Sequence, residues 1–144
     1  MSKFSIDLSK AIDEMDKDAH KKVRATLAGI SNLIIKGTPV GDPKLWKNPD
    51  SVPKGYTGGA LRGAWNASLN TQDLSASKRR KAKVGTSIVA KATRVANKLE
   101  FGDTFFLTNP LPYALRVENG WSKQRPKGMV AVAIAQAQQV LNKL

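Results

Sequence analysis

The clearest pattern of hydrophobic and polar positions runs through residues 8–36. Apolar side chains recur there every three or four positions, as on one face of an α-helix; they are Ile12, Met15, Ala19, Val23, Leu27, Ile30 and Ile34. Ser9 is a suitable N-cap, and Gly37 is a suitable end before Thr38-Pro39. Such a helix would be about 40 Å long at ~1.5 Å per residue. Because a domain of this size does not easily cover that length, we expect part of the apolar face to meet another subunit.

The pattern in the rest of the chain predicts a small sheet and further helices. Residues 61–70 and 103–109 are typical of strands, and a further strand is expected near 84–88 after a hairpin-like excursion. Residues 86–99 are also compatible with a helix, and apolar spacing predicts a last helix over 129–144. We therefore expect one α+β domain over residues 1–144. It would combine a long N-terminal helix, a small, mostly antiparallel sheet and a C-terminal helix packed on it.

Residues 37–60 predict an extended loop inside this domain. Four prolines and five glycines in this stretch leave no room for a long regular element. Leu45, Trp46 and Tyr56 still provide apolar anchors. The loop is therefore expected to lie against other parts of the protein.

Charge and composition narrow the class of protein. The chain of 144 residues has a net charge of +13. Residues 1–53 hold 9 Lys+Arg against 7 Asp+Glu, whereas residues 54–144 hold 15 against 4, so the positive charge is concentrated in the second part. That asymmetry favours acidic partners, either nucleic acid or an acidic protein surface. There is no cysteine, no apolar run of the ~18 residues that span a bilayer and no apolar core of a signal peptide, so we expect a soluble cytosolic protein without membrane contact.

The residues that catalysis needs are scarce. His20 is the single histidine and lies among lysines on the polar side of the first predicted helix, where a solvated side chain is expected. The glycine-rich stretch "GYTGGALRG" lacks the spacing of a phosphate-binding loop and precedes a predicted strand. Glu100 and Asp103 are better explained as a pair that caps the 103–109 strand than as an acid–base pair. We therefore predict no enzyme activity, no catalytic residues, no cofactor and no metal.

A basic run lies in the hairpin-like excursion between the strand predicted at 61–70 and the strand expected near 84–88. It consists of Lys78, Arg79, Arg80, Lys81 and Lys83. These side chains are suited to phosphate contacts, and equally to a solvated loop. Because no aromatic residues are interleaved with them for base stacking, any contact with DNA would be to the backbone alone. The run is expected to face either DNA or an acidic protein partner.

Three stretches carry a resemblance to a known family. The first helix ends in Thr38-Pro39-Val40, "YTGGALRGAW" spans residues 56–65, and "TNPLPYALRVENGWSKQRPKGMV" spans residues 108–130. Their order and spacing resemble the neck or tail-completion proteins of tailed bacteriophages, also described as head–tail connector or minor tail components. The segment with the form PYA…E-x-G…P-x-G-M is the most specific. Family members often pass from TPV almost directly to the TG turn, whereas here about sixteen residues, 41–56 with Trp46, are inserted.

The resemblance implies a structural virion protein. It would form a homo-oligomeric ring, often six-fold and sometimes twelve-fold, that joins the DNA-filled head to the tail. Its partners would be further copies of itself, the portal or adaptor, and tail proteins, with at most transient contact with genomic DNA. It would be made in the host cytoplasm and end in the virion neck. The alternative is a basic DNA-binding protein without sequence specificity.

Several residues are predicted to lie at subunit or partner interfaces. They are Trp46, Trp65, Tyr113, Glu118, Trp121 and Met129. Glu118 is the one acid in the basic segment 108–130 and is expected to pair with an arginine, nearby or on a neighbouring subunit. Gly120 is expected to allow a tight reversal of the chain, and Gly128 is expected to let it turn into the last helix.

Overall fold

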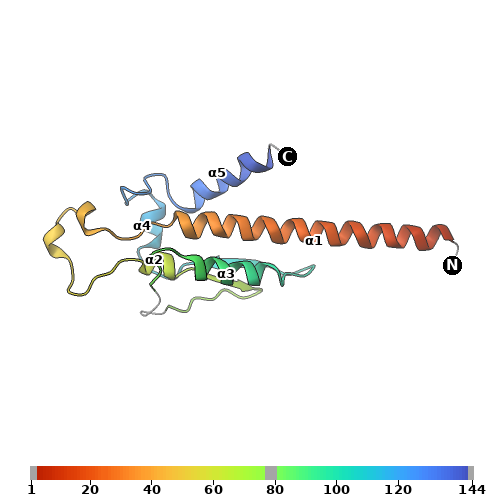
Figure 1. Ribbon diagram of the computed structural model, residues 1–144, viewed down its shortest axis with the longest axis horizontal. Coiled ribbons are helices and arrows are strands. Elements are labelled where there is room, and N and C mark those ends of the chain that lie inside the picture. The colour runs from red at the N-terminus through yellow and green to blue at the C-terminus, as the bar shows by residue number, and fades with distance from the viewer. Residues whose placement is uncertain (1–2, 77–80, 143–144) are drawn as a thin grey trace.

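A long helix organises the whole molecule. The computed structural model describes residues 3–76 and 81–142. Helix α1 (Lys3–Gly37) extends along the longest axis of the molecule, and the other elements gather around its C-terminal half (Figure 1). At ~1.5 Å per residue, α1 is about 52 Å long. It begins before Ser9, so Ser9 is not its N-cap, whereas the predicted end at Gly37 is confirmed.

The remaining elements are short. The loop after α1 contains two 3₁₀ turns, η1 (Pro43–Leu45) and η2 (Pro49–Ser51), which are followed by helix α2 (Ala60–Gly63) and strand β1 (Asn66–Leu69). Helix α3 (Thr86–Ala96), strand β2 (Phe105–Thr108), and helices α4 (Ala114–Glu118) and α5 (Val130–Leu141) complete the chain. The α+β prediction with a long first helix, a small antiparallel sheet and a C-terminal helix is confirmed. The expectation that the C-terminal helix packs on the sheet is wrong, because α5 packs against α1.

The strands of the sheet are shorter than predicted. Strands β1 and β2 pair antiparallel, with Asn66 opposite Thr108 and Leu69 opposite Phe105. The expected strand at 61–70 is a strand only from Asn66, because residues 60–63 form α2. The glycine-rich stretch therefore opens a short helix rather than a strand. The expected strand near 84–88 is wrong, because Thr86 begins α3, where Ile88, Ala92 and Ala96 point one helical face into the core.

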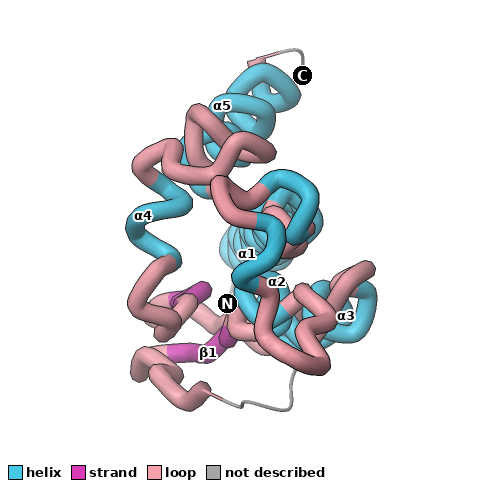
Figure 2. The backbone as a smooth tube through the Cα atoms, turned by 90° about the vertical axis from the view of Figure 1, so that its left-hand side faces the viewer, coloured by secondary structure: helices cyan, strands magenta, loops and turns pink. Residues whose placement is uncertain are grey.

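The core lies where α1 is sandwiched between two layers. Viewed along α1, helix α5 lies on one side of it, and α3 with the sheet lies on the other (Figure 2). Ile34 and Ile35 of α1 are buried against side chains from both layers. The buried partners are Leu61, Trp65, Ala67, Ile88, Ala92, Val117, Met129 and Ala133. Because the core ends near this half of α1, the N-terminal half of the helix projects beyond the body of the domain (Figure 1).

Candidate functional site

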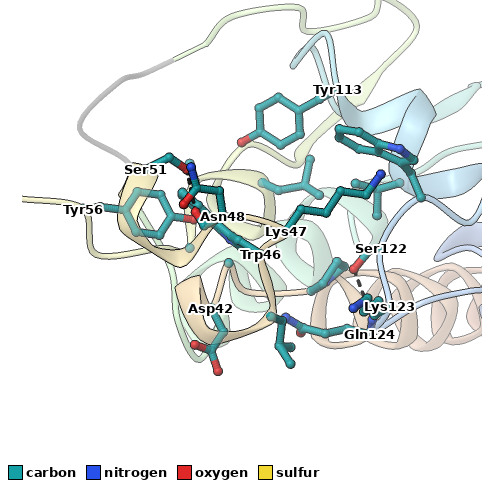
Figure 3. Close-up of a pocket in the computed structure, with 18 residues that line it drawn as sticks. Asp42, Trp46, Lys47, Asn48, Ser51, Tyr56, Tyr113, Ser122, Lys123 and Gln124 are labelled. Carbon is teal, nitrogen blue, oxygen red and sulfur yellow. Dashed lines mark hydrogen bonds between the residues drawn. The ribbon is translucent and has the colours of Figure 1, made fainter. Parts of the chain in front are cut away.

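An aromatic groove lies at the end of the molecule opposite the N-terminus. Its two walls are the loop that follows α1 and the segment from Tyr113 to Gln124 (Figure 3). The groove has a volume of about 530 Å³, within the range of about 300–1,000 Å³ that is usual for ligand sites. We call it the aromatic groove; its main lining side chains are Leu45, Trp46, Lys47, Tyr56, Tyr113, Val117, Trp121 and Lys123.

Aromatic side chains dominate the walls of the groove. The rings of Trp46 and Tyr56 pack edge to face, with centroids 5.0 Å apart and planes inclined by 68°. Tyr113 is 40% exposed and Trp121 is 70% exposed. The guanidinium of Arg116 lies 5.5 Å from the centre of the Trp121 ring, which is a cation–π contact beside the groove. An apolar hollow with exposed aromatic rings is typical of a surface that binds another molecule.

The charges around the aromatic groove are mainly positive. Lys47 and Lys123 line it with one acid, Asp42. The two chain segments that form its walls, 40–56 and 113–128, together hold seven Lys+Arg against three Asp+Glu, which is a local excess of +4. The groove therefore favours a partner that is apolar at its centre and acidic around it.

The wall that carries Tyr113 and Trp121 is held in place by Glu118. Its carboxylate accepts hydrogen bonds from the backbone N–H groups of Met129 (2.8 Å), Val130 (2.9 Å) and Ala131 (3.0 Å), so it caps the N-terminus of α5. Burial alone would raise the pKa of Glu118, but these three backbone bonds outweigh it and hold the pKa below its ordinary value. Among the described residues no arginine pairs with Glu118, because the backbone N–H groups at the start of α5 take that place. Pairing with an arginine of a neighbouring subunit stays a prediction.

Two glycines allow this cap to form. Gly128 has a φ of +91°, and a Cβ there would lie 2.6 Å from the carbonyl oxygen of Glu118. Gly120 has a φ of +87°, and a Cβ there would lie 2.4 Å from the carbonyl oxygen of Pro126. A side chain at either position would push apart the two backbone segments that meet there. The turns predicted at Gly120 and Gly128 are therefore confirmed. The loop 118–129 is closed by the hydrogen bond from Met129 N to the Glu118 carboxylate.

The other wall of the groove starts at the C-terminal end of α1, which is also capped by distant residues. The buried Thr38 hydroxyl donates to Ile34 O (2.8 Å) and accepts from Trp65 Nε1 (2.7 Å). The Arg62 guanidinium donates to Lys36 O (3.0 Å) and to Thr38 O (2.6 Å).

Two further contacts close this end of α1. Arg62 also donates to Lys83 O, and Arg125 donates to Gly37 O. Burial, followed by the positive charge of Arg125, lowers the pKa of Arg62 from its ordinary value. Two guanidinium groups thus satisfy carbonyls at the negative end of the helix dipole.

The structure divides the predicted interface residues into two groups. Trp46, Tyr113 and Trp121 come together in the aromatic groove. Trp65 and Met129 are only 6% and 3% exposed and belong to the core, so they cannot contact a second protein in this conformation. Glu118 belongs to neither group, because its carboxylate binds the start of α5 and so positions the loop that carries Trp121.

The basic run is only partly described. Lys78, Arg79 and Arg80 lie outside the described residues. Lys81 and Lys83 are exposed, and the backbone beside them is tied to α2 because Ala82 N donates to Gly59 O at 2.9 Å. The prediction that this run faces DNA or an acidic partner stays open.

A second exposed surface lies on the projecting half of α1. Ile12 is 57% exposed and Met15 is 72% exposed, and every residue from Ser9 to Ala19 is exposed. The same stretch, residues 9–20, carries four acidic against two basic side chains, a net charge of −2. We call it the acidic helix segment. Part of the apolar stripe is therefore left uncovered by this chain, and the expectation that it meets another subunit stays a prediction.

Several functional residues lack a clear signal in the sequence. Tyr56, predicted to be an apolar anchor, also lines the groove together with Lys47 and Lys123. The hydrogen bonds of Thr38 and Arg62 do not follow from the short motifs that contain them. The local signals are Thr38-Pro39 directly after the first helix and Arg62 shortly after a pair of glycines. Neither signal indicates which groups the Thr38 and Arg62 side chains bind.

Two kinds of site are absent from the described part of the chain. Within residues 3–76 and 81–142, no three or more His, Asp or Glu side chains gather as metal ligands would. Over the same ranges no helix has the length and apolar character needed to cross a membrane.

Comparison with protein-family models, curated proteins and solved structures found no match to this chain.

Proposed function

We propose that this protein is a non-enzymatic structural subunit that assembles with copies of itself into a ring at the head–tail junction of a tailed bacteriophage. The location follows from the resemblance of the segments around Thr38, Arg62 and Glu118 to phage neck and tail-completion proteins. The ring would join the portal or adaptor above it to the tail below. The protein would be made in the host cytoplasm and become part of the virion.

The observation that carries the proposal is the projecting half of α1. Ile12 and Met15 are apolar but largely exposed, and burying such side chains contributes about 1.5–3 kcal/mol each. A helix that projects from its own domain with an apolar stripe is suited to contact between subunits. Contacts between unlike surfaces of identical subunits close into rings when the rotation between neighbours permits it.

The architecture of the resembling motifs supports the same conclusion. Thr38 and Arg62 close the end of α1, and Glu118 caps α5 across Gly128. All four act by holding segments of the chain together rather than by presenting reactive groups. Such residues are what a rigid building block requires.

The proposed assembly is tested by measuring the mass of the purified protein in solution and by imaging the particles. Ile12→Asp/Met15→Asp is expected to abolish oligomers while leaving circular dichroism and thermal stability of the monomer unchanged, because both side chains are exposed. Leu74→Asp is a matched control, since Leu74 is 63% exposed but belongs to the loop after β1 rather than to α1. Oligomers that survive the Ile12/Met15 change at wild-type abundance would contradict the proposal.

The location is tested in the virion. Particles produced without this polypeptide are expected to have filled heads and detached tails, and complementation with the wild-type chain is expected to restore attachment. Tails that remain firmly attached in its absence would rule out a role at the junction.

The net charge of +13 favours one alternative, a DNA-binding protein without sequence specificity. That function predicts duplex binding that weakens steeply as salt rises, because phosphate contacts release counterions. The ring function predicts little affinity for free duplex DNA. Titration of a short labelled duplex at two salt concentrations separates the two.

A further inference from the structure

We infer that the aromatic groove of one copy of this chain receives the acidic helix segment of the next copy. The inference rests on the proposed ring and names the two surfaces that form its repeating contact. One surface is the groove lined by Trp46, Tyr56, Tyr113 and Trp121. The other is the exposed apolar stripe of Ile12, Met15 and Ala19, with the acidic side chains beside it.

The positions of the two surfaces support a head-to-tail contact. The N-terminus of α1 lies at one end of the longest axis of the molecule, and the loop that forms the groove lies at the other end (Figure 1). Because α1 is one continuous helix of 35 residues, its N-terminal half cannot fold back to fill the groove of its own chain. A second copy can present that half to the groove, and its own groove is then left open for a third.

The spacing of the apolar residues suits the groove. Ile12, Met15 and Ala19 are separated by three and four positions and so lie on one face of α1. Helices that bind in apolar grooves use anchors with this spacing. The volume of about 530 Å³ accommodates several side chains, and the exposed rings of Tyr113 and Trp121 offer broad apolar contact at its rim.

The charges of the two surfaces are complementary. The acidic helix segment has a net charge of −2 from Asp13, Glu14, Asp16 and Asp18 against two lysines. The two segments that form the groove walls have an excess of +4, and Lys47 and Lys123 line the groove itself. Opposite charges around an apolar centre favour this pairing and disfavour contact between two α1 helices in the same region.

The absence of cysteine in the chain allows a direct test. Ala11→Cys places a thiol beside the apolar stripe, and Ser122→Cys places one in the groove lining. Mixing these two variants under mild oxidation is expected to give a disulfide-linked dimer, whereas either variant alone gives little. Ser87→Cys, on the exposed face of α3, replaces the groove thiol in a matched control and is expected to give no product with Ala11→Cys.

Two cross-linking results would contradict the inference. Efficient dimers of Ala11→Cys alone would show that two α1 helices pair with each other. Equal products from the Ser122 and Ser87 variants would show random collision. Either result overturns the docking in the groove.

Complementary defects provide the second test. Ile12→Asp/Met15→Asp removes the helix surface, and Trp121→Ser/Lys123→Glu removes the groove surface without touching the core. Each variant alone is expected to associate about tenfold or more weakly than wild type. An equimolar mixture is expected to form a one-to-one dimer and nothing larger, because one intact helix and one intact groove remain.

The outcomes separate this inference from the proposed function. If the groove variant assembles as wild type does, the groove is not the docking surface although the ring proposal stands. If wild-type rings form but the mixture of defective variants gives no dimer, the same conclusion follows. If the wild type does not assemble and the Ala11→Cys and Ser122→Cys variants do not cross-link, the inference fails, and the virion experiment then decides on the proposed function independently.

Discussion

The carboxylate of Glu118 accepts a hydrogen bond from the backbone N–H of Met129 at 2.8 Å and thereby joins α4 to the start of α5. Glu118→Ala is expected to destabilise the fold by about 1–2 kcal/mol, the usual loss when a helix N-cap is removed. Urea denaturation measures this change. Glu14→Ala, on the exposed half of α1, is the control and is expected to change the unfolding free energy by less than about 0.5 kcal/mol. A loss at Glu118 no larger than at Glu14 would contradict the capping role.

The same carboxylate predicts a dependence of stability on pH. The pKa of Glu118 is lowered in the folded state, so its stabilising contribution is complete above its unfolded pKa of about 4.3 and is lost as pH falls through the folded pKa. Wild type is therefore expected to exceed Glu118→Gln in stability at neutral pH, with a difference that narrows below about pH 4.3. Thermal melts of both proteins between neutral and acidic pH test this. A constant difference across that range would exclude the linkage.

Gly128 and Gly120 are expected to resist substitution. Gly128→Ala would place a Cβ 2.6 Å from Glu118 O in a left-handed conformation, so a loss of more than about 1 kcal/mol is expected. Gly29 lies within α1 with no atom within 4 Å of an added Cβ, so Gly29→Ala is expected to stabilise by about 0.5–1 kcal/mol. Denaturation curves that shift in opposite directions would bear out both expectations. Tolerance of alanine at Gly128 would show that the cap can form with a different loop.

The buried contact between Trp65 and Thr38 should show energetic coupling. Trp65→Phe removes the indole N–H that donates to Thr38 Oγ1 at 2.7 Å, and a loss of about 1–2 kcal/mol is expected from the hydrogen bond and the altered packing. A double-mutant cycle with Thr38→Val measures the coupling, for which we expect about 0.5–1.5 kcal/mol. Additive effects would mean that packing alone explains the loss.

Arg62 should not be replaceable by lysine. Its planar guanidinium donates to Lys36 O and Thr38 O, as well as to Lys83 O, whereas a lysine ammonium cannot reach all of them in the same geometry. Arg62→Lys is expected to destabilise by about 1–3 kcal/mol. Arg94→Lys, on the exposed side of α3, is the matched control and is expected to be nearly neutral. Hydrogen exchange at the last turn of α1 should speed up in the Arg62 variant alone.

The first and last helices were predictable from the sequence because their signals are local, whereas the short helices α2 and α4 were not predicted. The apolar spacing from Ile12 to Ile34 and the glycine at residue 37 define α1 to within a few residues at each end. The strand expected near Val84 was wrong because a short apolar run fits either a strand or a helix. Packing against α1 decided the matter, since Ile88, Ala92 and Ala96 bury one helical face there.

The aromatic groove was only partly predictable. Trp46, Tyr113 and Trp121 stand out in the sequence as aromatic residues in loops, but nothing local indicates that they meet. Trp65 and Met129 were also expected at interfaces, yet they are buried. Composition therefore identified candidate contact residues without separating the surface from the core.

The amino-acid sequence was enough to predict the α+β class, the position and amphipathic face of the long helix, the excess of positive charge after residue 53 and the need for glycine at two turns. These properties follow from periodicity, charge and backbone conformation, which act between near neighbours in the chain. Three features depend instead on how the chain packs: Glu118 binds the N-terminus of α5, Arg125 donates to Gly37 O, and the groove and the projecting helix lie at opposite ends of the molecule. Arg125 and Gly37 are 88 residues apart, and partners at such distances are chosen by the packing of the whole chain rather than by any local pattern.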